Sequence, residues 1–328
     1  MIVSNDSITK PPFDITPEIL QLIASISEKL GEIKASLLIK PSPQLRKANR
    51  VKTIGSTLAI EGNTLSQKQV TAVLEGKRVL APQKDILEIE NAIKTYVQLS
   101  TFKPASLPSF LKAHKLLMAG LMKDAGKLRT GSVGIVKGNE LKHLAPPANN
   151  LKALLNALFE YLKKSNDHSL IISCVAHYEL TFIHPFSDGN GRMARLWQSI
   201  ILSNFNPVFT YLPFENVIRE NQEAYYSALE QSDKMGNSTV TIEFLLGAIN
   251  ESLAVFLNQQ GNTKTATDRI ELFLEQHSKT SFTRKDYMLM FKNISTATAS
   301  RDLKLALDAK LIVKQGDKRN TVYQIKKV

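Results

Sequence analysis

Apolar residues recur at helical spacing through most of residues 16–260, and this period constrains the fold more than any other feature of the sequence. One helix is predicted to begin at Thr16 with Pro17 in its first turn, and another at Ser66, where Gln69 completes a capping-box pattern. Further helices are predicted over residues 53–62, 85–100, 107–121, 149–164 and 170–183. The content of 43% hydrophobic and 22% charged residues is that of an ordinary globular protein. The pattern therefore predicts an all-α body.

Residues 129–147 interrupt the helical pattern. They are rich in glycine and hold two short apolar runs on either side of Lys137-Gly138-Asn139, which is a signal for a β-hairpin. Because a lone hairpin is only marginally stable, we expect it to lie on the helical body as a flap. An ordinary surface loop is the alternative interpretation.

The carboxyl-terminal part of the chain has a different pattern. Residues 257–268 indicate a polar linker, and they are followed by three short amphipathic helices and two strand-like runs within residues 312–325. The order of elements resembles a winged helix-turn-helix module, whose third helix enters the major groove of DNA. The residues expected to face the groove are Thr296, Thr298, Ser300, Arg301 and Lys304. Many such modules instead dock partners or dimerise, so both uses stay open.

Charge and cysteine content narrow the range of functions. The net charge is +12, and residues 262–328 hold 14 Lys/Arg and 7 Asp/Glu, which favours either a nucleic-acid partner or a solvated basic surface. The single Cys174 excludes an intrachain disulfide framework and a multi-cysteine zinc site. Residues 1–14 show no secretory signal, and we find no uninterrupted apolar stretch of about 20 residues, the length of a membrane span. We expect a cytoplasmic protein that does not bind membranes.

Residues 184–197, HPFSDGNGRMARLW, combine polar groups that a hydrophobic core does not need. Pro185 disfavours a helical conformation at His184, so the preceding helix should end there. A new helix should begin near Gly191, and the amides of the turn Gly189-Asn190-Gly191 then form an anion site at its amino terminus. Arg192 and Arg195 lie three residues apart on that helix, and their planar guanidinium groups suit phosphate oxygens.

Two further side chains complete the predicted chemistry of this loop. Asp188 is placed to hold a magnesium ion that bridges nucleotide phosphates. A neutral His184 at the entrance of the loop could take a proton from an attacking hydroxyl. The loop lacks the Gly-Lys-Ser/Thr ending of a P-loop, and His177 lies seven residues from His184, so neither a P-loop nor a HExxH zinc site is predicted.

The same residues resemble the HPFxxGNGRxxR signature of Fic-domain proteins at every defining position. The resemblance covers roughly residues 50–250 and implies an all-helical fold with a hairpin flap before the motif. It implies transfer of AMP from ATP to a Ser, Thr or Tyr hydroxyl of a protein, with release of pyrophosphate. In this family, His184 would be the general base, Asp188 the Mg2+ ligand and Gly189–Arg192 the phosphate cradle. The flap, residues 129–147, would hold the target segment by strand-like pairing.

A second resemblance lies in residues 56–63, STLAIEGN. Thr57, Glu61 and Gly62 match the inhibitory [S/T]xxxE[G/N] motif of Fic proteins, in the subclass that often carries a carboxyl-terminal winged helix. A glutamate in the last turn of a helix opposes the helix dipole, so Glu61 needs a compensating cation. In the family that cation is the second motif arginine, here Arg195.

Residues 224–233, AYYSALEQSD, resemble the family segment that contacts the adenine base. Tyr226 is the candidate for stacking on the base. Asp233 stands where related members carry Asn, so its hydrogen bond to adenine does not follow from the resemblance. Both residues would also fit the surface of an amphipathic helix.

These observations predict an all-α Fic fold with a small β-hairpin flap, followed by a winged helix-turn-helix domain. The predicted parts are residues 1–100 with the inhibitory helix, the catalytic core 101–256, the linker 257–268 and the winged helix 269–328. The predicted activity is protein adenylyltransfer held in check by Glu61, on a target not identified by the sequence. The family also implies self-modification and a homodimer. The alternatives are a hydrolase that removes AMP, a different phospho-group donor, or a DNA-binding regulator acting through residues 269–328.

Overall fold

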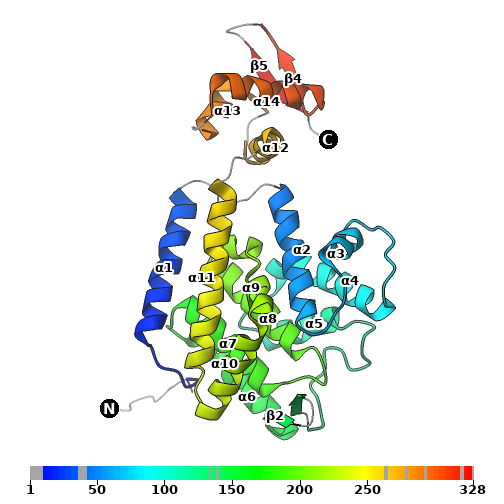
Figure 1. Ribbon diagram of the computed structural model, residues 1–328, viewed down its shortest axis with the longest axis vertical. Helices are drawn as coiled ribbons and strands as arrows, with labels where there is room; N and C mark the ends of the chain where they lie inside the picture. Colours follow the sequence, from blue (N-terminus) through cyan, green and yellow to red (C-terminus); the bar gives the residue numbers. More distant parts are fainter. Residues whose placement is uncertain are drawn as a thin grey trace. The chain divides into compact units, whose positions relative to one another are not determined.

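The computed structural model describes residues 10–35, 43–132, 134–137, 140–261, 265–277, 280–291, 294–317 and 321–326. They divide into two compact units, one within residues 1–37 and 49–256 and the other within 38–48 and 257–328. The helices are α1 (Pro17–Ala35), α2 (Pro43–Ala59), α3 (Gln67–Leu74), α4 (Gln83–Val97), α5 (Leu107–Leu117), α6 (Leu151–Lys164), α7 (Ser169–Ile183), α8 (Asn190–Phe205), α9 (Phe214–Glu220), α10 (Gln222–Met235), α11 (Thr239–Gly261), α12 (Ala266–Gln276), α13 (Arg284–Met290) and α14 (Thr296–Asp308) (Figure 1). The strands are β1 (Gly134–Lys137), β2 (Glu140–Leu144), β3 (Ser281–Phe282), β4 (Ile312–Gln315) and β5 (Val322–Ile325).

The expected helix starts at Thr16 and Ser66 and the mostly helical character are confirmed. The helix predicted over residues 53–62 instead runs from Pro43 to Ala59, so Glu61 lies in the turn after it. Helix α1 begins at Pro17, and the Thr16 hydroxyl accepts a hydrogen bond from the amide of Ile19 at 3.2 Å. Helix α3 follows Ser66, whose capping box with Gln69 is complete in both directions. The caps satisfy amides that have no carbonyl partner within the helix, so local sequence fixes where these helices begin.

Helices α7 and α8 form the core of the first unit. Buried residues occur at almost every position of α8 from Asn190 to Leu202, so no face of this helix is left to solvent over that stretch. Trp197 of α8 packs edge-on against Phe110 of α5, with ring centroids 5.0 Å apart. The motif loop between α7 and α8 is therefore joined directly to the buried core of the unit.

Helix α11 extends into the stretch that the sequence predicts as a linker. It continues to Gly261, and α12 begins at Ala266, so residues 257–261 and 266–268 of that stretch are helical. Residues 239–259 are also apolar and long enough to span a membrane by length and composition alone, and half of that stretch is buried within the structure. Polar residues such as Glu243 interrupt the stretch, so it is not an uninterrupted apolar run in the sequence.

These polar residues of α11 pair within the first unit. The Thr16 hydroxyl donates to Glu243 Oε1 at 2.6 Å, and Lys29 Nζ donates to Asn250 Oδ1 at 3.0 Å. Both contacts join α11 to α1 or its cap, and the two helices lie side by side (Figure 1). Buried Leu245, Ile249 and similar residues then make α11 a core helix of this unit.

The predicted hairpin is confirmed. Strands β1 and β2 pair antiparallel, with Gly134 opposite Leu144 and Lys137 opposite Glu140, and the register shifts between Ile135 and Val136. The turn residues 138–139 lie outside the described part of the chain. A register shift twists a two-stranded ribbon locally.

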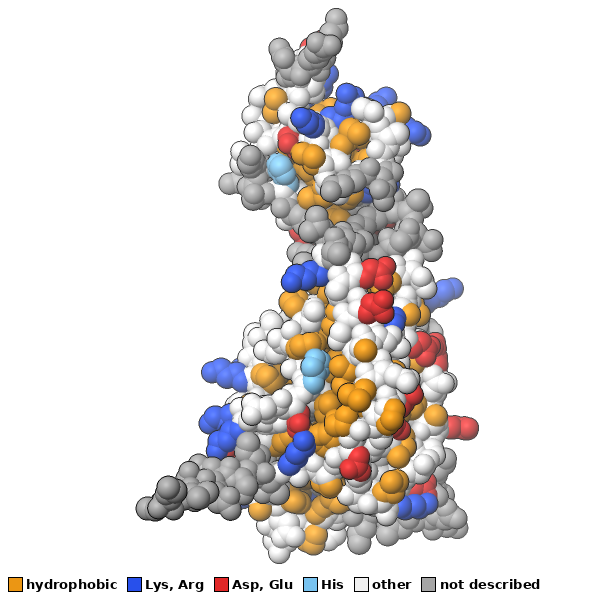
Figure 2. All heavy atoms as spheres, turned by 90° about the vertical axis from the view of Figure 1, so that its left-hand side faces the viewer, with side chains coloured by type: hydrophobic (Ala, Val, Ile, Leu, Met, Phe, Trp, Pro, Cys, Tyr) orange, Lys and Arg blue, Asp and Glu red, His pale blue; other side chains and the backbone are white. Residues whose placement is uncertain are grey.

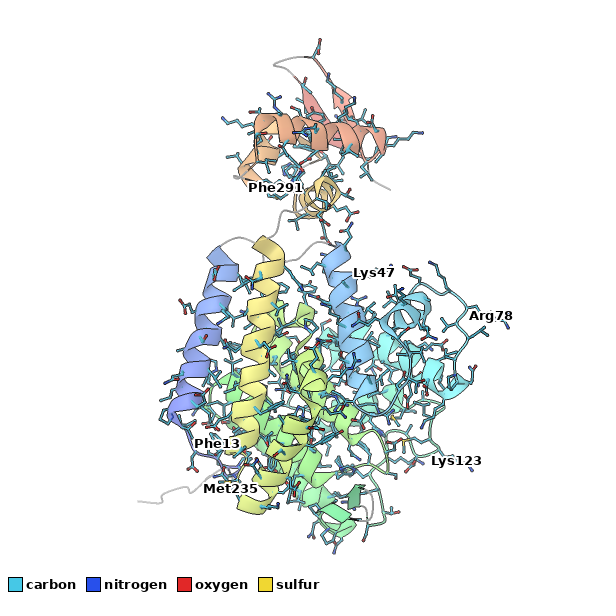
Figure 3. The ribbon with its side chains drawn as sticks, in the orientation of Figure 1. Phe13, Lys47, Arg78, Lys123, Met235 and Phe291 are labelled. Carbon is cyan, nitrogen blue, oxygen red and sulfur yellow. The ribbon has the colours of Figure 1, made fainter. Side chains whose placement is uncertain are left out.

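The second unit combines three helices with a small sheet in the order β3-β5-β4. Its core includes Phe273, Tyr287, Leu303 and Phe291, and Phe291, labelled in Figure 3, follows α13 in the chain. The buried Asp302 accepts hydrogen bonds from Arg269 Nε at 2.7 Å and from the Tyr287 hydroxyl at 3.0 Å. The two-residue strand β3 was not predicted, because so short an edge strand has no detectable alternation.

Candidate functional site

The loop between α7 and α8 is held by its own side chains. Helix α7 ends at Ile183, and His184 takes a left-handed conformation with φ 50° and ψ 59°, an uncommon state for a residue other than glycine. Asn190 Nδ2 donates to the Phe186 carbonyl at 2.8 Å, while Asn190 Oδ1 accepts from the Phe186 amide at 2.9 Å. The side chain of Asn190 therefore closes the loop. Only its backbone can take part in the predicted phosphate cradle.

His114, which the sequence analysis missed, packs against the motif loop. His114 of α5 is fully buried and stacks on Phe186, with ring centroids 3.5 Å apart. Its Nδ1 accepts a hydrogen bond from the Gly126 amide at 2.8 Å, so its Nε2 carries the proton and donates to the Asp188 carbonyl at 3.0 Å. Burial lowers the pKa of His114, which keeps the ring neutral in this role. No spacing in the sequence links His114 to the motif.

Side chains of neighbouring elements lie close to the first residues of α8 and to the N-cap before them. Gly189 is the N-cap with φ 83°, and a Cβ there would lie 2.8 Å from Met118 Sδ. A Cβ at Gly191 would lie 2.5 Å from Glu61 Oε1 and 3.3 Å from Arg195 Nη1. The Glu61 carboxylate thus occupies the space directly over the helix terminus, where amides without helical partners favour an anion.

Arg195 forms an ion pair with Glu61, the carboxylate that the family motif predicts as its partner. Its Nη2 donates to Glu61 Oε1 at 2.6 Å and to the Thr57 carbonyl at 2.9 Å, while its Nε donates to Thr57 Oγ1 at 2.8 Å. The arginine side chain is 1% exposed and that of Glu61 is 27% exposed. Burial is the largest single effect on the pKa of Arg195 and lowers it, but the charge and hydrogen bond of Glu61, together with the nearby Tyr225 and Tyr96, hold the pKa above its ordinary value.

Gly62 follows in this turn with φ 90°, a conformation that glycine adopts without strain. The structure therefore brings Thr57, Glu61 and Gly62 together beside Arg195. The contact joins residues 134 positions apart in the chain.

Arg192 points to a different pair of acids. Its Nη1 donates to Glu88 Oε1 at 2.8 Å, and its Nη2 donates to Asp188 Oδ1 at 2.9 Å. The side chains of Arg192 and Glu88 are 5% and 7% exposed. The sequence analysis missed Glu88. A polar stripe formed by Glu88, Asn91 and Thr95 beside the apolar Ile89 and Ala92 of α4 was the available signal, and all five are buried.

Asp188 has the chemistry of a magnesium ligand but stands alone. Within the described ranges, no three His, Cys, Asp or Glu side chains form a group that could hold a metal ion. Mg2+ bound with a nucleotide does not need such a group, because it takes one or two carboxylates together with phosphate oxygens and water. The Asp188 side chain is 56% exposed and lies beside Arg192. Its hard oxygen donors therefore fit this ion.

The adenine candidates lie on α10. Tyr226 is 43% exposed, and Asp233 Oδ1 accepts a hydrogen bond from the Tyr178 hydroxyl at 3.0 Å. On the same helix, Gln222 Nε2 donates to the Ile60 carbonyl at 3.2 Å. Helix α10 thus contacts the turn that carries Glu61, and Tyr226 lies one helical turn beyond that contact. A partly buried Asp233 engaged by Tyr178 differs from a simple solvated surface residue.

Arg129 is a third residue that the sequence analysis missed, after His114 and Glu88. It is 5% exposed, and its guanidinium donates to backbone carbonyls on both sides of the site. Nε donates to the His184 carbonyl at 2.7 Å and Nη1 to the Gly131 carbonyl at 2.7 Å, and Nη2 donates to the carbonyls of Pro146 and Ile183. Arg129 therefore ties both ends of the flap segment to the histidine of the motif. Its place before a glycine-rich stretch gave no sign of this.

Comparisons with known proteins agree with this geometry. Residues 104–202 match the Fic/DOC family. The chain is 37% identical to a Fic family protein from Desulfovibrio desulfuricans G20 of known crystal structure, with a TM-score of 0.74 and coverage of 97% of this chain and 98% of that one.

Two curated relatives carry a named activity. Protein adenylyltransferase Fic of Nematostella vectensis is 27% identical over 263 residues, covering 74% of this chain and 58% of that protein. Protein adenylyltransferase fic-1 of Caenorhabditis briggsae is 30% identical over 241 residues, covering 65% and 44%. The chain thus spans about half the length of these relatives. With nearly full-length similarity to the bacterial protein and the motif residues assembled around one loop, this chain belongs to the Fic family.

Proposed function

We propose that the protein transfers AMP from ATP to a hydroxyl group of a target protein. The observation that carries the proposal is the single loop on which His184, Asp188 and the α8 amino terminus lie together, fixed by Asn190. The names of the curated relatives, protein adenylyltransferases, support the same reaction. In this reaction the target oxygen bonds to the α-phosphorus, and the bond from that phosphorus to the bridging oxygen of pyrophosphate breaks.

His184 is the proposed general base. Its Nδ1 lies 3.3 Å from the Thr181 carbonyl, which can only accept a hydrogen bond. Nδ1 therefore carries the proton and Nε2 keeps a lone pair, so Nε2 can take the proton of the attacking hydroxyl. The Arg129 contact to the His184 carbonyl, 2.7 Å long, holds the backbone from which the ring extends.

The triphosphate is proposed to lie over the amino terminus of α8. Amides of Asn190 and Gly191 offer donors there, and the helix dipole favours negative charge. The Gly189 amide donates to Asp188 Oδ1 at 2.6 Å, so it would join them only when Asp188 turns away. Arg192 and Arg195 would add charge-assisted hydrogen bonds to the phosphate oxygens. A Mg2+ ion held by Asp188 would neutralise charge that develops on the phosphates when it is bound. Tyr226 is the proposed stacking partner of the adenine ring.

Glu61 is proposed to inhibit the reaction. Its carboxylate accepts from Arg195 at 2.6 Å and fills the space over Gly191. An outer phosphate that entered this space would lose Arg195 and meet a like charge. The α-phosphate would then be out of line with the incoming hydroxyl, and misplacement by about 1 Å can reduce the rate by roughly 100-fold.

The β1–β2 hairpin is proposed to bind the target. Its two strands pair with each other, so an outer edge of the ribbon has backbone groups to offer an extended segment. Arg129 connects the ends of this flap to the backbone of His184. A segment bound there would present its hydroxyl toward the base.

The experiment is incubation of four forms of the full chain with α-32P-labelled ATP and cell lysate. The forms are the parent, Glu61→Gly, His184→Ala and the double variant. We expect stronger labelling by Glu61→Gly than by the parent, and a loss of roughly two to four orders of magnitude when His184→Ala is added. Label transfer undiminished by His184→Ala, with the variant folded, would exclude this mechanism.

One measurement separates the transferase from the hydrolase alternative. A target labelled beforehand by Glu61→Gly is incubated with the parent, and release of AMP is followed. If Glu61 positions water for hydrolysis, the parent removes the label and Glu61→Gly does not. Retention of label with the parent supports a purely inhibitory Glu61.

For the second unit we propose a winged helix that binds double-stranded DNA, as a function beside the transferase. Helix α14 exposes Thr296, Ser300, Arg301 and Lys304 and leaves Thr298 half-buried, and Figure 2 shows Lys and Arg side chains on the surface of this unit. A gel-shift series across salt concentrations tests it, because phosphate contacts give a steep salt dependence. Arg301→Ala should weaken binding and relax sequence preference. Absence of duplex binding in the full chain at low salt leaves docking as the role of this unit.

A further inference from the structure

Glu88 lies in a buried polar chain between Asn63 and Arg192. Its Oε1 accepts from Arg192 Nη1 at 2.8 Å, and its Oε2 accepts from Asn63 Nδ2 at 2.9 Å. Asn63 also donates to the Asp85 carbonyl at 3.1 Å and accepts from the Leu65 amide at 3.2 Å. Both carboxylate oxygens of Glu88 are thus engaged by side chains that are themselves fixed.

The hydrogen bonds of Arg192 show which nitrogen atoms of its guanidinium have partners. Nη1 faces Glu88, and Nη2 faces Asp188. Nε is buried and has no hydrogen-bond partner among the described residues. A buried unpaired donor is unfavourable, and Nε lies on the same edge of the guanidinium as Nη2. That edge can bind a planar or tetrahedral oxyanion with two parallel hydrogen bonds.

Because both side chains are buried, the ion pair with Glu88 strongly restricts the orientation of the Arg192 guanidinium. A guanidinium 5% exposed and a carboxylate 7% exposed interact in a poorly screened environment. Removing one partner leaves the other charge buried without compensation. Asp188 is different. Its Oδ1 also accepts from the Gly189 amide at 2.6 Å, but its side chain is 56% exposed, so water can take the place of both partners when it turns away from Nη2. Glu88 then remains as the fixed partner of Arg192.

We propose that Glu88 is a positioning residue for the transfer reaction. It holds Nη1 of Arg192, so that the Nε–Nη2 edge faces a nucleotide phosphate once Asp188 turns away. Asn63 fixes Glu88, and it lies two residues after Glu61. One turn of the chain therefore contacts both motif arginines, Arg195 directly and Arg192 through Glu88. This inference rests on the proposed function only for the identity of the phosphate compound.

The test introduces Glu88→Gln into the full chain that carries Glu61→Gly. Glutamine keeps the size of the side chain and removes the charge. We expect kcat/KM for AMP transfer to fall by about 10- to 100-fold, and the affinity for ATP measured by calorimetry to fall as well. Glu90→Gln is the matched control, because Glu90 lies exposed on the same helix. It should leave both quantities unchanged.

A double-mutant cycle with Arg192→Lys separates positioning from general destabilisation. If Glu88 acts through Arg192, Glu88→Gln should cost much less when Arg192 is already lysine. An equal loss in both backgrounds would overturn the proposal, as would ATP affinity and kcat/KM that match the Glu90→Gln control. If Glu88→Gln does not fold, Asn63→Ala removes one support of Glu88 and should cause a smaller loss in the same direction. An unchanged ATP affinity and kcat/KM in folded Asn63→Ala would equally overturn the proposal.

The same proteins distinguish this inference from the proposed function. Absence of AMP transfer by Glu61→Gly would count against the transferase. The ATP affinities of the four cycle members would still test whether Glu88 sets the phosphate-binding edge of Arg192.

Discussion

The ion pair between Glu61 and Arg195 should stabilise the fold while it opposes the nucleotide. Replacing Glu61 by glycine removes one acceptor from an arginine that is 1% exposed. Breaking a fully buried pair in this way costs roughly 3–5 kcal/mol. Glu61 is 27% exposed, and Arg195 keeps two contacts to Thr57. We therefore expect Glu61→Gly to lower the free energy of unfolding by about 1–2 kcal/mol.

ATP should reverse much of this loss. An outer phosphate can replace the carboxylate beside Arg195 in the variant but not in the parent. If ATP binds the variant about tenfold more tightly, saturating ATP adds about 1.4 kcal/mol more stability to the variant than to the parent. AMP has no outer phosphates, so it should stabilise both proteins equally.

The assay is urea unfolding of the parent, Glu61→Gly and Glu61→Gln, each without nucleotide, with AMP and with ATP. Glu61→Gln keeps the side-chain length and an acceptor oxygen, so it controls for the added backbone freedom of glycine. The reasoning is refuted if Glu61→Gly is as stable as the parent without nucleotide. It is also refuted if ATP stabilises the parent as much as the variant.

Two further predictions concern buried groups behind the site. Burial lowers the pKa of His177 to about 3, below its unfolded value of about 6.5, so the stability that is present above pH 6.5 is lost as the pH falls toward 3, by about 2 kcal/mol at pH 5. Urea unfolding at pH 7 and pH 5 should show this extra loss in the parent and not in His177→Gln. Equal losses in the two proteins would contradict the prediction. Arg129→Met leaves four carbonyls without their donor, so we expect a loss of roughly 1–3 kcal/mol in the free energy of unfolding. When Arg129→Met is added to Glu61→Gly, AMP transfer should weaken while the affinity for ATP is retained. Unfolding and transfer like those without Arg129→Met would show that Arg129 does not hold the flap and His184.

The sequence determined the features that depend on neighbouring residues. Helical spacing, the caps at Thr16 and Ser66 and the helix break before Pro185 all act within one or two turns, and the structure has each of them. The hairpin signal around Lys137 was local in the same sense. The family motif added the pairing of Glu61 with Arg195, which the spacing of residues alone does not predict.

The sequence does not show where a helix ends when contacts with other elements decide it. Residues 257–268 contain the polar composition of a linker, yet α11 continues to Gly261 and α12 begins at Ala266. A helix that is packed along its length can extend through polar residues, because tertiary contacts contribute more than propensity. The apolar length of α11 escaped notice for a related reason, since its interrupting Glu243 is paired with Thr16.

Only the tertiary structure decided which polar side chains meet. Glu88 and Arg192 are 104 positions apart, and Arg129 reaches the His184 carbonyl across 55 positions. A buried charge must have a partner, but nothing in the local pattern says which one the packing will supply. The sequence therefore determined the helices and the motif loop, while the packing of α2 and α4 against α8 determined how its two arginines are held.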